Sequence, residues 1–261
     1  MPLWIVLVLA YFFEFANGWT DAPNSIATVV STRVLKPHYA VMMAATLNLV
    51  GALSGTAVAR TIAEGILDPR FVSLETVAAA VLAASIWALG AQYFGLPSSE
   101  THALIAALLG AGFAMGGLTP LRWKGTEAAL IGLVTSPVGG FIAGLLLMLV
   151  IYRVFRRVRR PVVSRFFGRA QIFSAAFMAF SHGTNDAQKT MGIISLALVL
   201  NRAGTGEHVG KLDIPLWVIV SCALVMGTGT MIGGWRVVRT IGLRMTKLEP
   251  VHGFAAETGA A

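Results

Sequence analysis

Two aspartates in apolar surroundings are the residues best suited to chemistry in this sequence. Asp21 and Asp186 each lie inside a long hydrophobic stretch. An ionised Asp inside a membrane costs about 2.5–3.5 kcal/mol on insertion scales, so it needs a partner or a function. The amide oxygens of the nearby Asn17, Asn24 and Asn185 could help to form the shell of a hard cation such as sodium. The alternative is that each Asp only hydrogen-bonds a helix end at a break.

A second motif offers donors to an anion. Pro97 is followed by Ser98, Ser99 and Thr101, and then by an apolar helical stretch at 103–115. Proline suits the first turn of a helix and serine caps it, so free backbone N–H groups and three hydroxyls would face whatever lies beyond this helix start. The alternative is an ordinary helix cap. Neither a His-Glu-x-x-His zinc motif nor a nucleophile elbow is present in the sequence, so we do not expect an enzyme.

The elements that position these residues are membrane spans. Hydrophobic residues make up 56% of the 261-residue chain and charged residues only 12%, against roughly 25% charged in soluble domains. A soluble globular protein is therefore excluded, and we expect an all-α polytopic membrane protein. Seven apolar segments are long enough to span a bilayer, which takes roughly 20 residues each. They lie at 3–32, 40–63, 74–95, 98–118, 126–152, 171–200 and 215–235.

These segments should be irregular at two places. Glu14, Asn17 and Asp21 interrupt the first segment, and only 94–99 separates the third from the fourth. Broken or re-entrant helices are expected there, covered by protein or lining a cavity. The single cysteine, Cys222, excludes an intrachain disulfide and is expected to be a small packing residue.

Basic residues predict the orientation. Seven of the 20 Lys and Arg residues lie between Arg153 and Arg169, and basic residues accumulate in cytoplasmic loops. Counting spans from that loop places the N-terminus outside. Two further clusters fall on the inner side, namely Arg33 with Lys36, and Arg236, Arg239, Arg244 and Lys247. A nucleic-acid-binding arm is the alternative, but beside membrane spans we favour a topology signal or anionic-lipid contact and expect no nucleic-acid partner.

The surroundings of the two aspartates form an internal repeat. At an offset of 165 residues, five identities fall within eleven aligned positions. The pairs are Phe12 with Phe177, Phe15 with Phe180, Gly18 with Gly183, Asp21 with Asp186, and Ala22 with Ala187. Because span six is an odd number of spans after span one, the copies cross the membrane in opposite directions. Inverted-topology repeats are typical of secondary transporters, with sites where paired helices are interrupted, and sodium or a proton is the natural coupling ion.

Three sequence runs resemble the signatures of one known family. They are Asn17-Gly-Trp-Thr-Asp-Ala-Pro-Asn-Ser at 17–25, Leu-Pro-Ser-Ser-Glu-Thr-His at 96–102, and His-Gly-Thr-Asn-Asp-Ala-Gln-Lys-Thr at 182–190. The resemblance, to the bacterial low-affinity branch of the inorganic phosphate transporter (PiT) family, extends along the whole chain. It implies ion-coupled symport of inorganic phosphate by a homodimer in the bacterial cytoplasmic membrane, without a cofactor.

The resemblance also implies a set of site residues. Phosphate would be bound by Asp21, Ser98, Ser99, Thr101 and Asp186, and the cation by Asn17, Asp21, Asn24, Asn185 and Asp186. Glu100 occupies a variable position of the motif and is not included. An aspartate suits a phosphate site because it can accept a hydrogen bond from a P–OH group, which fully deprotonated sulfate lacks.

The repeat divides the chain into three parts. We expect a first membrane repeat at 1–152, a basic cytoplasmic loop at 153–170 and a second, inverted repeat at 171–261. Asp21 precedes Pro97 by 76 residues, and the same step from Asp186 leads one position beyond Ala261. The second repeat is therefore expected to be truncated before its own Pro-Ser-Ser element. Alternative functions are a sulfate or metal–phosphate permease of the same family, or a non-transporting membrane fragment or receptor.

Overall fold

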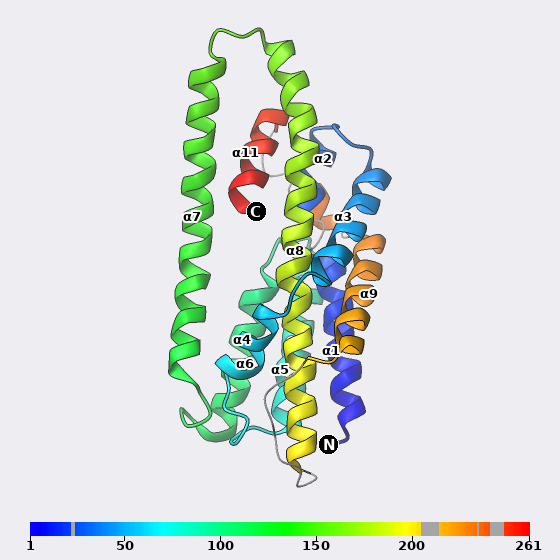
Figure 1. The fold of residues 1–261 in the computed structure, drawn as a ribbon, viewed down its shortest axis with the longest axis vertical. Coiled ribbons are helices and arrows are strands. Elements are labelled where there is room, and N and C mark those ends of the chain that lie inside the picture. Colours follow the sequence, from blue (N-terminus) through cyan, green and yellow to red (C-terminus); the bar gives the residue numbers. More distant parts are fainter. Residues whose placement is uncertain (22–23, 205–213, 234, 241–247) are drawn as a thin grey trace.

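The computed structural model describes residues 1–21, 24–204, 214–233, 235–240 and 248–261, and this part of the chain is helical (Figure 1). Its only β-type pairing, within those ranges, is an isolated bridge between Leu67 and Leu121. The helices are α1 (Leu3–Thr20), α2 (Asn24–Ser31), α3 (Pro37–Ala52), α4 (Ala57–Gly65), α5 (Leu74–Phe94), α6 (Glu100–Gly116), α7 (Trp123–Phe155), α8 (Arg160–Gly204), α9 (Leu216–Ile232), α10 (Trp235–Arg239) and α11 (Pro250–Ala260).

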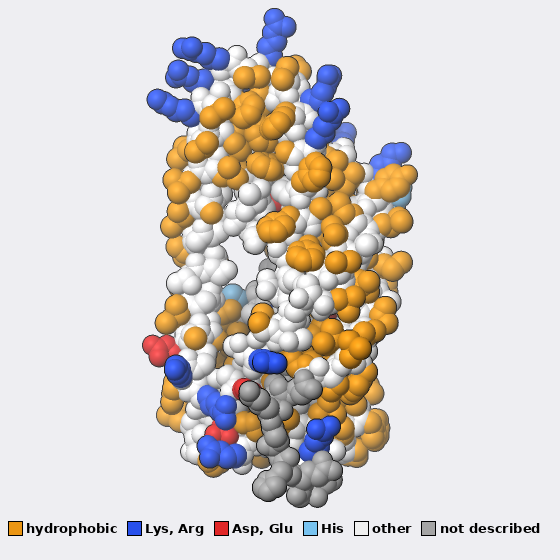
Figure 2. Space-filling model, in the orientation of Figure 1, with side chains coloured by type: hydrophobic (Ala, Val, Ile, Leu, Met, Phe, Trp, Pro, Cys, Tyr) orange, Lys and Arg blue, Asp and Glu red, His pale blue; other side chains and the backbone are white. Residues whose placement is uncertain are grey.

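Several helices are long and apolar enough to cross a membrane. In the part of the chain that the structure describes, three segments qualify by length and composition: Leu3–Ser31, Leu74–Phe94 and Trp123–Phe155. A fourth span forms if α3 and α4, bent by 66° at a short break, are counted together. The apolar helices α6 and α9 are shorter, and α8 contains the predicted sixth segment. Hydrophobic side chains cover much of the visible outer surface (Figure 2). The expected all-α membrane fold is confirmed.

The first predicted segment contains two helices, and residues 22–23 between them lie outside the described part of the chain. Helix α1 ends at Thr20, Asp21 forms its C-terminal cap, and α2 begins at Asn24. Pro23 in the intervening sequence lacks an N–H donor, and a proline disfavours helical backbone in the residue before it. The second copy differs, because α8 continues through Asp186. At the offset of 165 residues, Pro23 corresponds to Gln188, which can stay in a helix.

The third and fourth predicted segments form an antiparallel pair of packed helices, α5 and α6. Helix α5 begins at a capping box on Ser73 and ends at Gly95, whose positive φ of 67° is readily adopted by glycine. Helix α6 begins after Ser99, whose Oγ accepts a 3.3 Å hydrogen bond from the backbone N–H of His102. This turn places the Pro-Ser-Ser motif at the start of α6.

Two glycines related by the repeat allow close helix contacts. A Cβ added at Gly18 would lie 2.3 Å from the carbonyl oxygen of Met226 on α9. One added at Gly183 would lie 2.2 Å from the carbonyl oxygen of Asn48 on α3. Each copy of the repeat thus packs a glycine against a helix that lies far from it in sequence. These crossings bring α1 and α8 to fixed positions beside their neighbours.

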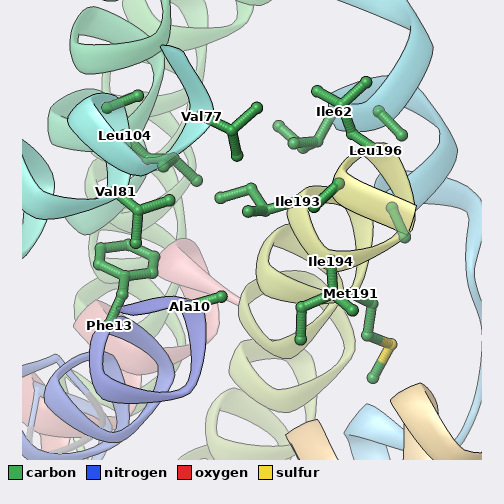
Figure 3. Packing of buried hydrophobic residues seen from close by; sticks show 14 of the residues in the cluster. Ala10, Phe13, Ile62, Val77, Val81, Leu104, Met191, Ile193, Ile194 and Leu196 are labelled. Carbon is green, nitrogen blue, oxygen red and sulfur yellow. The ribbon is translucent and has the colours of Figure 1, made fainter. Parts of the chain in front are cut away.

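The main hydrophobic core joins both copies of the repeat. It contains Phe13 of α1, Val81 of α5 and Leu104 of α6, which lie beside Ile193 and Ile194 of α8 (Figure 3). All five side chains are fully or almost fully buried. The core therefore holds the end of α1, the start of α6 and the middle of α8 together, and the candidate site residues project from these three places.

Candidate functional site

Asp21 and Asp186 meet at a shared histidine. The Nε2 atom of His182 lies 3.5 Å from Asp21 Oδ2 and 3.3 Å from Asp186 Oδ2. His182 and Asp186 are one turn apart on α8, whereas Asp21 comes from the end of α1. One ligand atom from each of these residues lies within 4.8 Å of the other two. The arrangement could hold a cation or share a proton between two carboxylates.

Lys189 connects this cluster to the Pro-Ser-Ser motif. Its side chain is 2% exposed, and its Nζ lies 2.9 Å from Asp186 Oδ2. The same ammonium donates a 2.6 Å hydrogen bond to Thr101 Oγ1 on α6. A buried ammonium is normally paired because its desolvation is costly. Here the two partners come from the two motifs that sequence analysis selected independently.

A large cavity adjoins these groups. Its volume is about 1040 Å³, and it lies between α7 and the body of the protein. Figure 2 shows the molecule hollowed beside α7. The polar part of its lining comes from five helices and consists of Thr61, Ser99, Thr101, His102, Ser136, Asn185, Asp186, Lys189 and His252. Because hydroxyls, an amide, a carboxylate and an ammonium converge on one space, the cavity can offer both donors and acceptors to a small anion.

The structure joins some of the predicted site residues and separates others. Asn24 Nδ2 donates a 2.6 Å hydrogen bond to Asp21 Oδ1, so these two side chains are in contact. Asn185 is exposed to the cavity. Asn17 is completely buried, and its side-chain amide has no hydrogen-bond partner among the described residues. Ser98 is half-buried and is not one of the cavity-lining residues.

Ser99 has a structural role as well as a place at the cavity. Besides capping the backbone of α6, its Oγ lies 2.7 Å from His102 Nδ1. This hydroxyl therefore caps α6 at the same time as it lines the cavity. Thr101, which faces Lys189, is the motif hydroxyl that contacts the ion-pair cluster.

Three residues of the site were missing from the predicted set. Lys189 is a cation inside an apolar stretch, and His182 stands at i−4 from Asp186, so both carried a signal. Glu100 is 1% exposed and accepts a 3.0 Å hydrogen bond from Thr20 Oγ1. No local pattern shows that it would be buried, because a charged residue in the first turn of a helix is commonly solvent-exposed.

Comparison with known proteins gives a consistent answer. A model described as the Phosphate transporter family matches residues 17–165 and 155–261. The chain is 42% identical over 260 residues to a Bacillus subtilis protein named "Probable low-affinity inorganic phosphate transporter", covering 98% of this chain and 77% of that protein. A Rhizobium meliloti protein of the same name is 44% identical over 262 residues, covering 100% and 77%. These relatives are named as transporters, which agrees with the expectation that the chain is not an enzyme.

A solved structure shares the fold. The structure titled "The sodium-dependent phosphate transporter" superposes with a TM-score of 0.86 and 23% sequence identity. The alignment covers 99% of this chain and 83% of that one. At this level of identity the comparison concerns the arrangement of the helices.

Proposed function

Because this chain belongs to the phosphate transporter family, we propose that it carries inorganic phosphate across the bacterial cytoplasmic membrane together with a cation, sodium or a proton. The observation that carries the proposal is the bridge made by Lys189 between Asp186 and Thr101 at the wall of the cavity. It joins an acidic motif and a hydroxyl motif around one buried positive charge. A phosphate oxygen is a suitable ligand for that charge.

The proposed phosphate site uses both kinds of partner that a protonated phosphate needs. Ser98, Ser99 and Thr101 lie at the N-terminus of α6, where hydroxyls and the helix dipole favour an anion. Asp21 and Asp186 would accept hydrogen bonds from P–OH groups. Lys189 would supply the compensating charge. The direct contact of Thr101 with Lys189 supports this grouping, and Ser98 is its most peripheral member.

The proposed cation site overlaps with the phosphate site. Its oxygen ligands are Asp21, Asn24, Asn185 and Asp186, with Asn17 one turn away from Asp21 on α1. The hydrogen bond between Asn24 and Asp21 supports their assignment to one site. A cation between the two carboxylates would reduce their repulsion toward phosphate, so that binding of one favours binding of the other. That mutual dependence is the physical basis of symport.

Orientation and assembly remain proposals. The arginines between Arg153 and Arg169 gather at the end where α7 meets α8, in Figure 2 the upper end. We place this end in the cytoplasm, with the N-terminus outside. Of the last predicted basic cluster, Arg244 and Lys247 lie outside the described residues. We further propose that the protein forms a homodimer. Each chain would contain one repeat at 1–152 and a second at 171–261, joined by the loop at 153–170.

Uptake by purified protein in liposomes tests this function. Labelled phosphate should accumulate when an inward sodium or proton gradient is imposed, and each gradient should be tested alone. Excess sulfate should compete weakly, whereas strong competition would favour a sulfate permease. A requirement for divalent metal would favour transport of a metal–phosphate complex. Phosphate binding without uptake under every gradient would indicate a receptor and contradict the proposal.

A further inference from the structure

Glu14 is a buried carboxyl that the proposed phosphate and cation sites leave unused. It lies on α1, two turns before the break at Asp21, and its exposure is 0%. Among the described residues, neither of its carboxyl oxygens has a hydrogen-bond partner. Buried carboxylates are normally paired or bound to a metal ion, and otherwise they take up a proton. Glu14 therefore requires an explanation beyond packing.

Among the described residues, three helices pack closely against α1, namely α5, α8 and α9. Helix α8 places His182, Asp186 and Lys189 within electrostatic reach, and Thr190 faces Glu14 from the same helix. From α9 the only titratable side chain is Cys222, and from α1 itself Tyr11 is nearby. The titratable residues of α5 are Glu75 and Tyr93, at its two ends. Glu75 pairs with the N-terminal ammonium.

Both neighbouring basic side chains already have other partners. Lys189 contacts Asp186 and Thr101, and His182 lies between Asp21 and Asp186. With Glu100, four carboxyl groups occur in this region beside two basic side chains. Bound cations or protons must neutralise this excess of negative charge. Bound phosphate adds further negative charge, so more cations or protons are then needed.

We propose that Glu14 is a proton-binding residue whose protonation accompanies phosphate binding at the Asp186–Lys189–Thr101 site. An anion bound beside Lys189 adds negative charge near Glu14 and withdraws a cation from the carboxylates. Both effects favour transfer of a proton from water to a Glu14 carboxyl oxygen, where an O–H bond forms. By linkage, a protonated Glu14 favours phosphate to the same extent. This rests on the proposed function and identifies one coupling ion as a proton.

The surroundings favour a proton over sodium at Glu14. Sodium requires several oxygen ligands around it, whereas a proton requires a single oxygen. The backbone carbonyls near Glu14 belong to the continuous helix α1, in which they accept helical hydrogen bonds. Ala10 and Phe13, which are near Glu14 on the same helix, belong to the hydrophobic core (Figure 3). In such a position a neutral carboxyl is easier to bury than an ion with an incomplete shell.

The test compares phosphate binding by the wild type and Glu14→Gln over a range of pH at constant sodium. Glutamine resembles the protonated carboxyl, so the variant should bind phosphate as tightly as the wild type at low pH. As the pH rises through the titration of Glu14, the ratio of the wild-type Kd to the variant Kd should increase by up to about tenfold per pH unit. The ratio removes the titration of phosphate itself. Glu127→Gln, at an exposed position of α7, is the matched control and should follow the wild type.

Two outcomes would overturn the inference. A constant ratio across the pH range means that Glu14 does not exchange a proton with phosphate binding. Loss of sodium dependence in Glu14→Gln, with the pH dependence retained, would make Glu14 a sodium ligand. If the variant does not fold, infrared difference spectra of the wild type and Glu14→Asp decide instead. A protonated-carboxyl band that appears with phosphate and shifts in Glu14→Asp supports the inference, and its absence contradicts it.

The infrared measurement also separates this inference from the proposed function. If the wild type binds phosphate but does not transport it, the proposed transport function is wrong. The infrared band of Glu14 and the Kd ratio then still test the proton site. If uptake occurs with no change at Glu14, transport stands and the proton site is wrong.

Discussion

The ammonium of Lys189 lies 2.9 Å from Asp186 Oδ2 and donates a 2.6 Å hydrogen bond to Thr101 Oγ1. Asp186 is one turn away on the same helix, whereas Thr101 belongs to a different helix 88 residues earlier. This single side chain therefore connects the acidic motif on α8 to the start of α6. Moving the start of α6 away from α8 beyond the reach of this side chain would break the contact.

Removing Lys189 should destabilise the protein. Lys189→Met leaves Asp186 buried with His182 as its remaining basic partner, and breaking a buried ion pair costs about 3–5 kcal/mol. The melting temperature in detergent should fall, and it should recover in part in the double variant Lys189→Met/Asp186→Asn. Lys124→Met, at an exposed position of α7, should have little effect. Equal stability of both single variants would show that the buried pair is not important.

Thr101 should matter more for phosphate affinity than for folding. Thr101→Ala removes one hydroxyl donor and should weaken phosphate binding about tenfold, equivalent to about 1.4 kcal/mol. Thr101→Ser retains the hydroxyl and should recover most of that affinity. Ser99→Ala removes a helix cap, so it should cost about 1 kcal/mol of stability in addition. The measurement is a phosphate titration with a parallel thermal melt, and unchanged affinity in both alanine variants would remove the hydroxyls from the site.

Asp68 should give the protein a component of acid sensitivity. It lies between α4 and α5, where the hydrogen bond from Arg70, aided by the charge of Arg122, lowers its pKa from 3.8 to about 2. Because the folded-state pKa is the lower one, ionised Asp68 stabilises the fold above about pH 4, and this contribution is lost as the pH falls toward 2. Thermal melts across that range should show a smaller acid-induced decrease for Asp68→Asn than for the wild type. Parallel curves would contradict the assignment.

The orientation can be tested with single cysteines. Cys222 is buried, so it should react little with thiol reagents. Ser164→Cys lies at the arginine-rich end and should resist an impermeant reagent in intact cells but react after lysis. Thr119→Cys, between α6 and α7 at the opposite end of the molecule, should react in intact cells. The reverse pattern would invert the topology.

The sequence predicted the break near Asp21 and the helix start at Ser99 because both have local causes. Pro23 cannot continue the hydrogen bonding of a helix, and Ser99 is a preferred cap. The repeat also aligns Gly18 with Gly183, and each of these glycines lies at a close contact between two helices. The helix end and the helix start depend on residues nearby in the sequence. The close helix contacts depend on glycine, which has no side chain to keep the helices apart.

The partnerships in the site depend on long-range packing and were not predictable in the same way. His182 lies between Asp21 and Asp186 because α8 continues through this region, whereas α1 ends there. The two copies of the repeat do not reveal that difference in sequence. Similarly, the sequence offered Ser98, Ser99 and Thr101 as equivalent hydroxyls. Only the position of the start of α6 relative to α8 makes Thr101 the partner of Lys189.

Phosphate uptake by Asp186→Asn is the most direct test of the proposed site. Asparagine has nearly the same size but cannot balance Lys189 or bind a cation as strongly. Purified wild type, Asp186→Asn and the exposed-site control Glu127→Gln should be reconstituted at equal amounts, with the imposed gradients unchanged. We expect labelled phosphate to accumulate with the wild type and Glu127→Gln and to stay at the background level with Asp186→Asn. Near-normal uptake by folded, inserted Asp186→Asn would contradict the account.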